Sequence, residues 1–119
     1  MLRWLLVAAA MLLSPPAFAQ AMPGMQMGGP PAPGEPASTK GYRDAMAKMD
    51  QGMSIPYTGD SDKDFVAGMI PHHQGAVDMA KVELQYGKDP QLKQLARNII
   101  KSQNEQIAFM KSWQARHAQ

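Results

Sequence analysis

Two adjacent histidines, His72 and His73, are the side chains of this sequence whose types and spacing are best suited to chemistry. Met69 precedes them and Met79 follows them within DFVAGMIPHHQGAVDMAKVEL, residues 64–84. Imidazole and thioether together favour copper, and thioether favours its reduced form, whereas zinc and iron sites more often recruit carboxylate or thiolate ligands. The ligand types therefore predict a copper site with Cu(I) favoured, at which silver would bind in the same way.

The spacing of these four residues limits what one helix can supply. Each residue advances an α-helix by about 100° and about 1.5 Å, so His72 and His73 lie about 60° to one side and about 40° to the other side of Met69. Met79 lies close to His72 in angle but about 10 Å further along the helix, too far to share an ion with ligand bonds of about 2.0–2.3 Å. Further ligands must therefore come from elsewhere.

Methionines in other parts of the chain, or in a second subunit, are the candidates for these further ligands. They are Met46, Met49, Met53 and Met110 in the expected helices, and Met22, Met25 and Met27 in the segment before them. Methionine also fills apolar cores and spacers, so each group has two interpretations. The row in the first helix is either core packing or part of a site, and the earlier group is either a Cu(I)-wrapping arm or a plain spacer.

An alternative without metal also fits the histidines. His73 extends a core row formed by Val66, Ile70, Val77 and Leu84, and in that case its ring would donate to a backbone carbonyl. Gln103 falls inside the apolar stripe of the last helix, where a buried amide needs a partner, and a histidine across the bundle is one candidate. Packing and metal binding are both open interpretations of the pair.

Three helical segments are predicted to position these residues. A short helix begins near Lys40 and ends at the breakers around Gly52, and a second begins at Asp60 or Ser61, where an acidic or hydroxyl side chain caps it. A third begins after Asp89, with proline at its first position, and carries an apolar face through to residue 113.

Glycine and proline in the second helix indicate special positions. Pro71 removes the hydrogen bond to the carbonyl of residue 67, so the helix either kinks or breaks there. Gly68 and Gly75 each cost helix stability by about 1 kcal/mol relative to alanine, which suggests the close approach of another helix or an ion. Gly87 is predicted to end the helix in a left-handed conformation.

The first residues have the pattern of a signal peptide. Arg3 precedes an apolar run from Leu5 to Leu13, and a small-x-small pattern ends at Ala19. The run is too short to span a bilayer, which needs about 20 residues as helix. We therefore expect a signal peptide over 1–19, a flexible Met-, Pro- and Gly-rich arm over 20–39, a helical domain over 40–119, and a periplasmic or secreted location without a membrane span.

Composition excludes several classes of function. Twelve basic and ten acidic residues give a net charge of +2, and removal of Arg3 would leave the chain almost neutral, so nucleic-acid binding has no electrostatic support. The sequence contains no cysteine, and neither a nucleophile elbow nor a phosphate-cradling loop is present. We therefore expect no enzyme activity, and any copper site must use His, Met, Asp or Glu.

Several segments resemble one known family. They are TGDSDKDF, MIPHHQGAVDMAKVEL and YGKDPQLKQLA, followed by the spaced residues Ile100, Gln103, Ile107, Met110 and Trp113, and they extend from Tyr57 to Trp113. This pattern resembles the bacterial domain of unknown function 305, a ferritin-like helical domain. The resemblance implies an exported bundle, and some relatives resemble periplasmic copper-binding proteins of copper resistance or trafficking.

The resemblance also implies roles for particular residues. Met69, His72, His73 and Met79 match the family's central motif, and Met110 falls at its recurrent methionine in the last helix. Gln106 stands where many relatives have glutamate, which weakens any argument for a carboxylate ligand there.

The sequence thus predicts an all-α, ferritin-like small bundle in which two long antiparallel helices pack with one shorter helix. The predicted function is sequestration or shuttling of copper in copper homeostasis or resistance, with a copper-transfer protein and a second copy of the chain as partners. The alternative is a metal-free helical interaction module with a Met-rich binding surface.

Overall fold

Residues 33–118 of the computed structural model form three α-helices, and the structure is described over this range. The helices are α1 (Ala37–Met53), α2 (Ser61–Tyr86) and α3 (Pro90–Arg116). The predicted all-α fold, with two long helices and one shorter helix, is confirmed. Helix α1 begins three residues before the predicted start at Lys40. Helix α2 runs without interruption through Pro71, so the alternative of a break at this proline is wrong.

Aspartates cap the two long helices, as the sequence predicted. The Asp60 carboxylate accepts hydrogen bonds from the backbone N–H groups of Asp62 and Lys63 at 3.0 and 3.2 Å. The Asp89 carboxylate does the same for Gln91 and Leu92 at 2.8 and 3.2 Å. These bonds satisfy backbone donors that have no partner within the helix.

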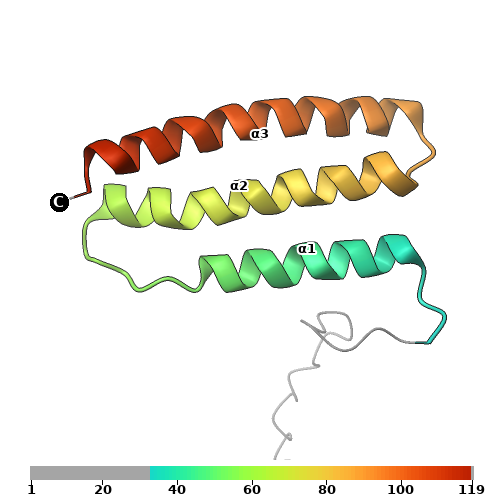
Figure 1. The fold of residues 1–119 in the computed structure, drawn as a ribbon, viewed down its shortest axis with the longest axis horizontal. Helices are drawn as coiled ribbons and strands as arrows, with labels where there is room; N and C mark the ends of the chain where they lie inside the picture. Colours follow the sequence, from blue (N-terminus) through green and yellow to red (C-terminus); the bar gives the residue numbers. More distant parts are fainter. Residues whose placement is uncertain (1–32, 119) are drawn as a thin grey trace, which may run out of the picture.

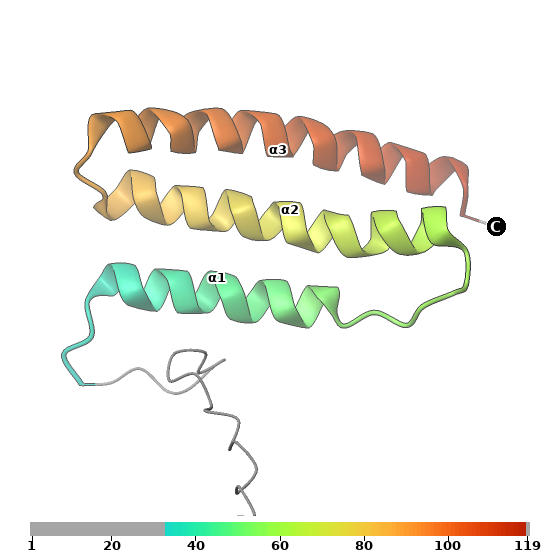
Figure 2. The ribbon, with the colours of Figure 1, turned by 180° about the vertical axis from the view of Figure 1, so that it is seen from behind.

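The helices lie side by side in a single layer (Figure 1). Helix α2 occupies the middle, with α1 along one side and α3 along the other, and the view from behind has the same order (Figure 2). Within residues 33–118, α1 and α3 do not contact each other. No helix in this range is long and apolar enough to cross a membrane. Helix α2 therefore has two packed sides and two broad faces that no other described helix covers.

The side between α2 and α3 holds the main apolar cluster. Val66 and Val77 of α2 pack with Ile107 and Met110 of α3, and Val77 is only 1% exposed. Half-buried side chains on both helices surround this cluster: Met69, Ile70, Ile100 and Trp113. Burial of large side chains is what holds this pair together, at about 25 cal/mol per Å² of apolar surface.

The side between α1 and α2 is built on glycine instead. A Cβ atom added at Gly75 would lie 2.6 Å from the Met49 sulfur, and one at Gly52 would lie 2.7 Å from Cβ of Pro71. One at Gly41 would lie 2.9 Å from a methyl of Val82. The two helices thus approach so closely that these positions accept no side chain without a shift. The expected close approach at Gly75 is confirmed, whereas Gly68 meets only Ile55 at 4.0 Å.

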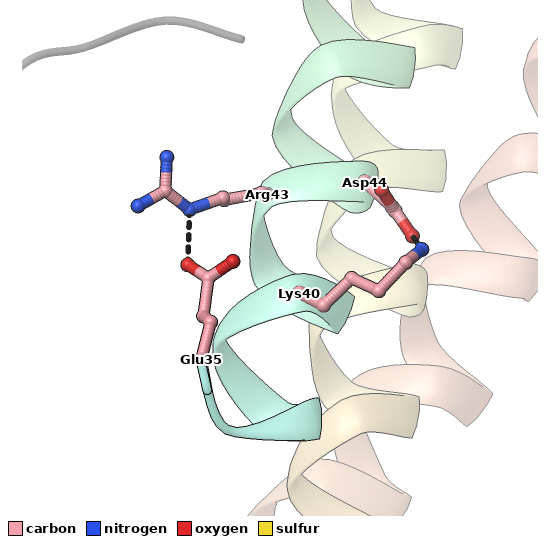
Figure 3. A network of polar contacts seen from close by, with 4 residues as sticks. All are labelled: Glu35, Lys40, Arg43 and Asp44. Atoms are coloured by element: carbon pink, nitrogen blue, oxygen red, sulfur yellow. Dashed lines mark hydrogen bonds and ion pairs between the residues drawn. The ribbon is translucent and has the colours of Figure 1, made fainter. Parts of the chain in front are cut away.

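Ion pairs fix the beginning of α1 (Figure 3). Arg43 donates from Nε to Glu35 Oε1 at 2.5 Å, which ties the residue before the N-cap to the second turn of the helix. Lys40 donates to Asp44 at 2.6 Å, and this hydrogen bond and the negative charge of Asp44 raise the pKa of Lys40. Since Pro36 at the N-cap offers no side-chain acceptor, the Glu35–Arg43 pair holds an end that lacks a capping side chain.

Candidate metal centre

A cavity of about 420 Å³ between α2 and α3 gathers three of the predicted ligands. It is lined by Phe65, Met69, His73, Glu105, Gln106, Phe109 and Met110. The ligand candidates among these are Met69, His73 and Met110, from two helices. The fold therefore does what one helix cannot, since α3 brings a second thioether to the side of α2 that carries His73 and Met69.

His73 is the one buried polar residue in the described part of the chain, with 8% of its surface exposed. Its ring Nε2 lies 2.6 Å from Oε1 of Gln106. An amide oxygen only accepts hydrogen bonds, so Nε2 carries the proton and donates. In the neutral ring the other nitrogen, Nδ1, then keeps a free lone pair.

The Nδ1 atom of His73 is buried and has no hydrogen-bond partner among residues 33–118. A buried polar atom left in this way costs about 1–3 kcal/mol. Histidines that ligate metals in proteins commonly donate their other ring N–H to an oxygen, which fixes the tautomer. His73 has an oxygen partner at Nε2 and a buried, unpartnered Nδ1, and the residue lines a cavity together with two thioethers.

The partner of His73 differs from the residue that the sequence suggested. Gln103 lies in the apolar stripe and was the candidate amide, but Gln106 makes the bond. Gln106 stands four residues before Met110 and therefore on the same side of α3. The four-residue spacing between Gln106 and the predicted ligand Met110 is the feature of the sequence that indicates Gln106 as a partner for His73. The backbone carbonyl predicted as the partner of a purely structural His73 is likewise replaced by this side-chain amide.

His72 lies in different surroundings from His73. Its side chain is exposed, and the two ring centroids are 6.0 Å apart with their planes at 60°. Met79, the second flanking methionine, is 39% exposed and lines another cavity, of about 290 Å³, together with Tyr42 of α1 and Leu92 of α3. The structure therefore separates His72 and Met79 from the cavity that holds His73.

The methionines of α1 also lie apart from that cavity. Met49 is half-buried against Gly75, while Met46 and Met53 are 40% and 41% exposed. The remaining candidates, Met22, Met25 and Met27, lie outside the described residues. Within residues 33–118, no three His, Asp, Glu or Cys side chains group as a metal site, and the cavity offers one imidazole and two sulfur atoms beside a single carboxylate, Glu105.

Two comparisons relate this chain to other proteins. The family model described as "Domain of unknown function (DUF305)" matches residues 15–115, which include the whole cavity. An uncharacterized protein, L153, of Acanthamoeba polyphaga mimivirus is 49% identical over 51 residues. That match covers 43% of this chain and 34% of the mimivirus protein, so the similarity spans about a third of that relative.

Proposed function

The chain belongs to the family Domain of unknown function (DUF305), and on that premise we propose that it is an exported protein that sequesters or shuttles copper. The cargo is Cu(I), and Ag(I) would bind in the same way. The ligands we assign are Met69, His73 and Met110, which line one cavity between α2 and α3.

The observation that carries this proposal is the unpartnered Nδ1 of His73. A soft metal ion at this atom would recover the cost of burying a lone pair without a partner. Gln106 would hold the ring in the tautomer that presents Nδ1, because its amide oxygen already accepts from Nε2 at 2.6 Å. The protein's own part in binding is thus to preset one nitrogen before the ion arrives.

The choice of ion follows from the donor set. Thioether sulfur is a soft, uncharged donor, and two of them with one imidazole suit Cu(I) better than zinc, magnesium or calcium. Glu105, the one carboxylate that lines the cavity, is paired with Lys101, which reduces its attraction for harder ions. Phe65 and Phe109 are exposed at this cavity, so it lies at the surface, where an ion can be exchanged.

The test is a Cu(I) competition titration of the purified chain against a calibrated chelator, with stoichiometry from native mass spectrometry. Replacing both Met69 and Met110 by leucine conserves side-chain volume, so the fold should be kept while the two sulfur ligands are removed. We expect the affinity to fall at least about 100-fold, a loss of about 2.7 kcal/mol. His73→Leu should have a similar effect.

Met49→Leu is the matched control, because this methionine packs against Gly75 outside the cavity. It should leave the Cu(I) affinity unchanged. Circular dichroism of each variant separates loss of the site from loss of the fold. Equal affinity in the wild type and the Met69→Leu, Met110→Leu variant would contradict the assigned ligands, and a wild-type chain without competitive Cu(I) binding would contradict the function.

A second candidate function has one observation in its favour. Large apolar side chains, among them Met46, Met79 and Leu95, are exposed on the helices. Methionine-rich apolar surfaces adapt to protein partners, so a metal-free interaction module would also use this chain's composition. Absence of Cu(I) binding together with stable helicity would favour this candidate.

A further inference from the structure

The exposed large apolar side chains of the three helices gather on one face of the layer. One cavity brings together Tyr42 of α1, Met79 of α2, and Leu92 and Leu95 of α3, so these four residues share a side. Residues at spacings of three and four follow the same stripe of a helix. The stripes continue through Met46 and Met53 on α1 and through Phe65, Met69, His72 and Ala76 on α2. We call this side of the layer the methionine face.

The opposite face of the layer is polar. A second cavity at α1 and α2 is lined by Lys48, Gln51, Gln74 and Asp78 in addition to Met49 and the closely packed residues of the helix contact. Lys48 and Asp78 form an ion pair at 3.3 Å on this side. On α2, Lys81 and Gln85 extend the polar stripe, because they lie seven and eleven residues after Gln74. The layer therefore has one face suited to water and one suited to apolar contact.

The methionine face is large enough for a stable protein interface. Helix α2 has 26 residues and is therefore about 39 Å long, and neighbouring helix axes lie about 8–10 Å apart. Because α1 has only 17 residues and is about 26 Å long, the area between the axes of α1 and α3 is roughly 500–650 Å² on one side, and the outer halves of these two helices add to it. Standard interfaces bury about 800 Å² on each partner, whereas scattered exposed apolar residues on a monomer need no partner.

The charge of the methionine face favours an identical partner. Glu83 is the one charged residue among those lining the cavity at Tyr42 and Met79, and Glu105, at the other cavity, is paired with Lys101. A strongly charged face cannot pair with its own copy without repulsion, but a nearly neutral apolar face can. Two-fold pairing of one patch with itself is also the commonest symmetry of homo-oligomers.

We propose that the methionine face binds a second copy of this chain, with His72 of each copy close to the two-fold axis. The greatest overlap of two such faces places the axis at their centre. Helix α2 is the middle helix and spans residues 61–86, so its midpoint falls next to His72, the residue of the stripe nearest that point. Residues close to a two-fold axis meet their own symmetry mates.

This arrangement gives a role to His72 and Met79, which do not line the cavity at His73. Two imidazoles and nearby thioethers from both copies would surround the axis, which is the donor chemistry of a soft-metal site between subunits. The pairing itself rests on apolar contact and needs no ion. It can therefore be tested separately from the proposed copper cavity.

The first test is sedimentation equilibrium of the purified chain with a chelator present. Leu95→Glu places a carboxylate on the methionine face, outside the cavity that holds His73. Asn104 lies nine residues further along α3, two and a half turns, and is exposed on the opposite side, so Asn104→Glu is the matched control. We expect a wild-type dimer, at least about tenfold weaker association for Leu95→Glu, and no change for Asn104→Glu.

The second test uses the absence of cysteine from this sequence. A disulfide requires Cβ atoms about 3.5–4.5 Å apart, so His72→Cys should link two copies on mild oxidation only if the residue lies near the axis. Gln85→Cys, on the polar stripe of the same helix, is the control and should stay unlinked. Linking at Gln85 but not at residue 72 would overturn the central axis.

A chain that remains monomeric at about 100 µM, or a Leu95→Glu variant that associates as well as the wild type, would overturn the proposed interface. Neither result would affect the cavity at His73, because the Cu(I) titration measures that site directly. Conversely, His73→Leu should keep the dimer even if its copper affinity is lost, because His73 is buried and is not among the residues of the methionine face. Failure of the interface and failure of the copper function are therefore distinguishable.

Discussion

The two sides of α2 are packed by opposite means. Against α1, glycines at positions 41, 52 and 75 let the helices meet so closely that no added side chain fits. Against α3, large side chains such as Val77, Ile107 and Met110 fill the space, and a cavity remains next to them. The comparison shows that the contact with α1 depends on the absence of side chains, whereas the contact with α3 places an imidazole and two thioethers beside a cavity.

The same comparison explains why His73 is available to a ligand. A buried histidine with both nitrogens bonded would be part of the core alone, but the contact with α3 supplies a partner for only one of them. Gly75 lies two residues further along α2 and faces Met49 of α1 instead. Two positions of one helix, two residues apart, thus serve a close helix contact and a candidate ligand site.

The largest effect on stability is expected from the side of α2 that packs large side chains. Val77→Ala removes two methyl groups at a position that is 1% exposed, and we expect a loss of about 2 kcal/mol in the free energy of unfolding. Val82→Ala, on the side toward α1, should cost about half as much because Val82 is only half-buried. Urea denaturation at one fixed protein concentration measures both.

Equal losses for the two valine variants would contradict this ranking of the two sides. Helical propensity cannot produce the difference, because both variants make the same substitution within the same helix. The fixed protein concentration matters, since self-association through the methionine face would add to the apparent stability.

A pair of glycine substitutions tests the close contact with α1, because the two variants should change the free energy of unfolding in opposite directions. Gly68→Ala meets nothing closer than 4.0 Å, so the gain in helix propensity should raise the free energy of unfolding by about 0.5–1 kcal/mol. Gly75→Ala brings the same gain, but its Cβ would lie 2.6–3.0 Å from three atoms of Met49. We expect the resulting shift to dominate and to lower stability by about 1 kcal/mol.

The measurement is again urea denaturation of the two variants beside the wild type. Opposite signs would confirm that the contact with α1 depends on the absence of a side chain at residue 75. A stabilised Gly75→Ala variant would show that Met49 moves aside at little cost.

Local signals made the helices predictable from the sequence. Asp60 and Asp89 sit where a side-chain oxygen must meet free backbone donors, and both act as caps. Gly87 was predicted to be left-handed and is extended instead, with φ of −67° and ψ of 156°. Its N–H still bonds to the Glu83 carbonyl at 2.7 Å, and an extended backbone here and at Asp89 carries the chain across to α3.

The candidate site was only partly predictable because it depends on how α3 sits against α2. The angle of about 100° between successive residues implied that His72 and His73 point apart, as their exposed and buried positions bear out. The register between α2 and α3 decides which of the two histidines faces α3. It also decides that Gln106, rather than Gln103, contacts His73. That register is a sum of many packing contacts, which no single motif encodes.

The smallest effect on stability is expected from Asp64, whose hydrogen bonds hold the loop between α1 and α2. The Asp64 carboxylate accepts from the backbone N–H of Thr58 at 2.8 Å, from its hydroxyl at 2.9 Å and from the N–H of Gly59 at 3.2 Å. These bonds lower the pKa of Asp64 below its usual value of 3.8, and the bond from the backbone N–H of Thr58 contributes most. A carboxyl with a lowered pKa stabilises the fold above its unfolded pKa and loses that contribution as pH falls through the folded one.

Asp64→Ala should therefore lower the Tm slightly at pH 7, and the difference from the wild type should shrink below about pH 4. Asp62→Ala is the control, because both aspartates lie in the first turn of α2 and contribute similarly to its helix dipole. Thermal unfolding followed by circular dichroism from pH 3 to pH 7 gives both series. If the Asp64 and Asp62 variants show the same decrease in Tm at every pH, the helix dipole alone explains the effect. The bonds from Asp64 to the loop then contribute nothing to the contact between α1 and α2.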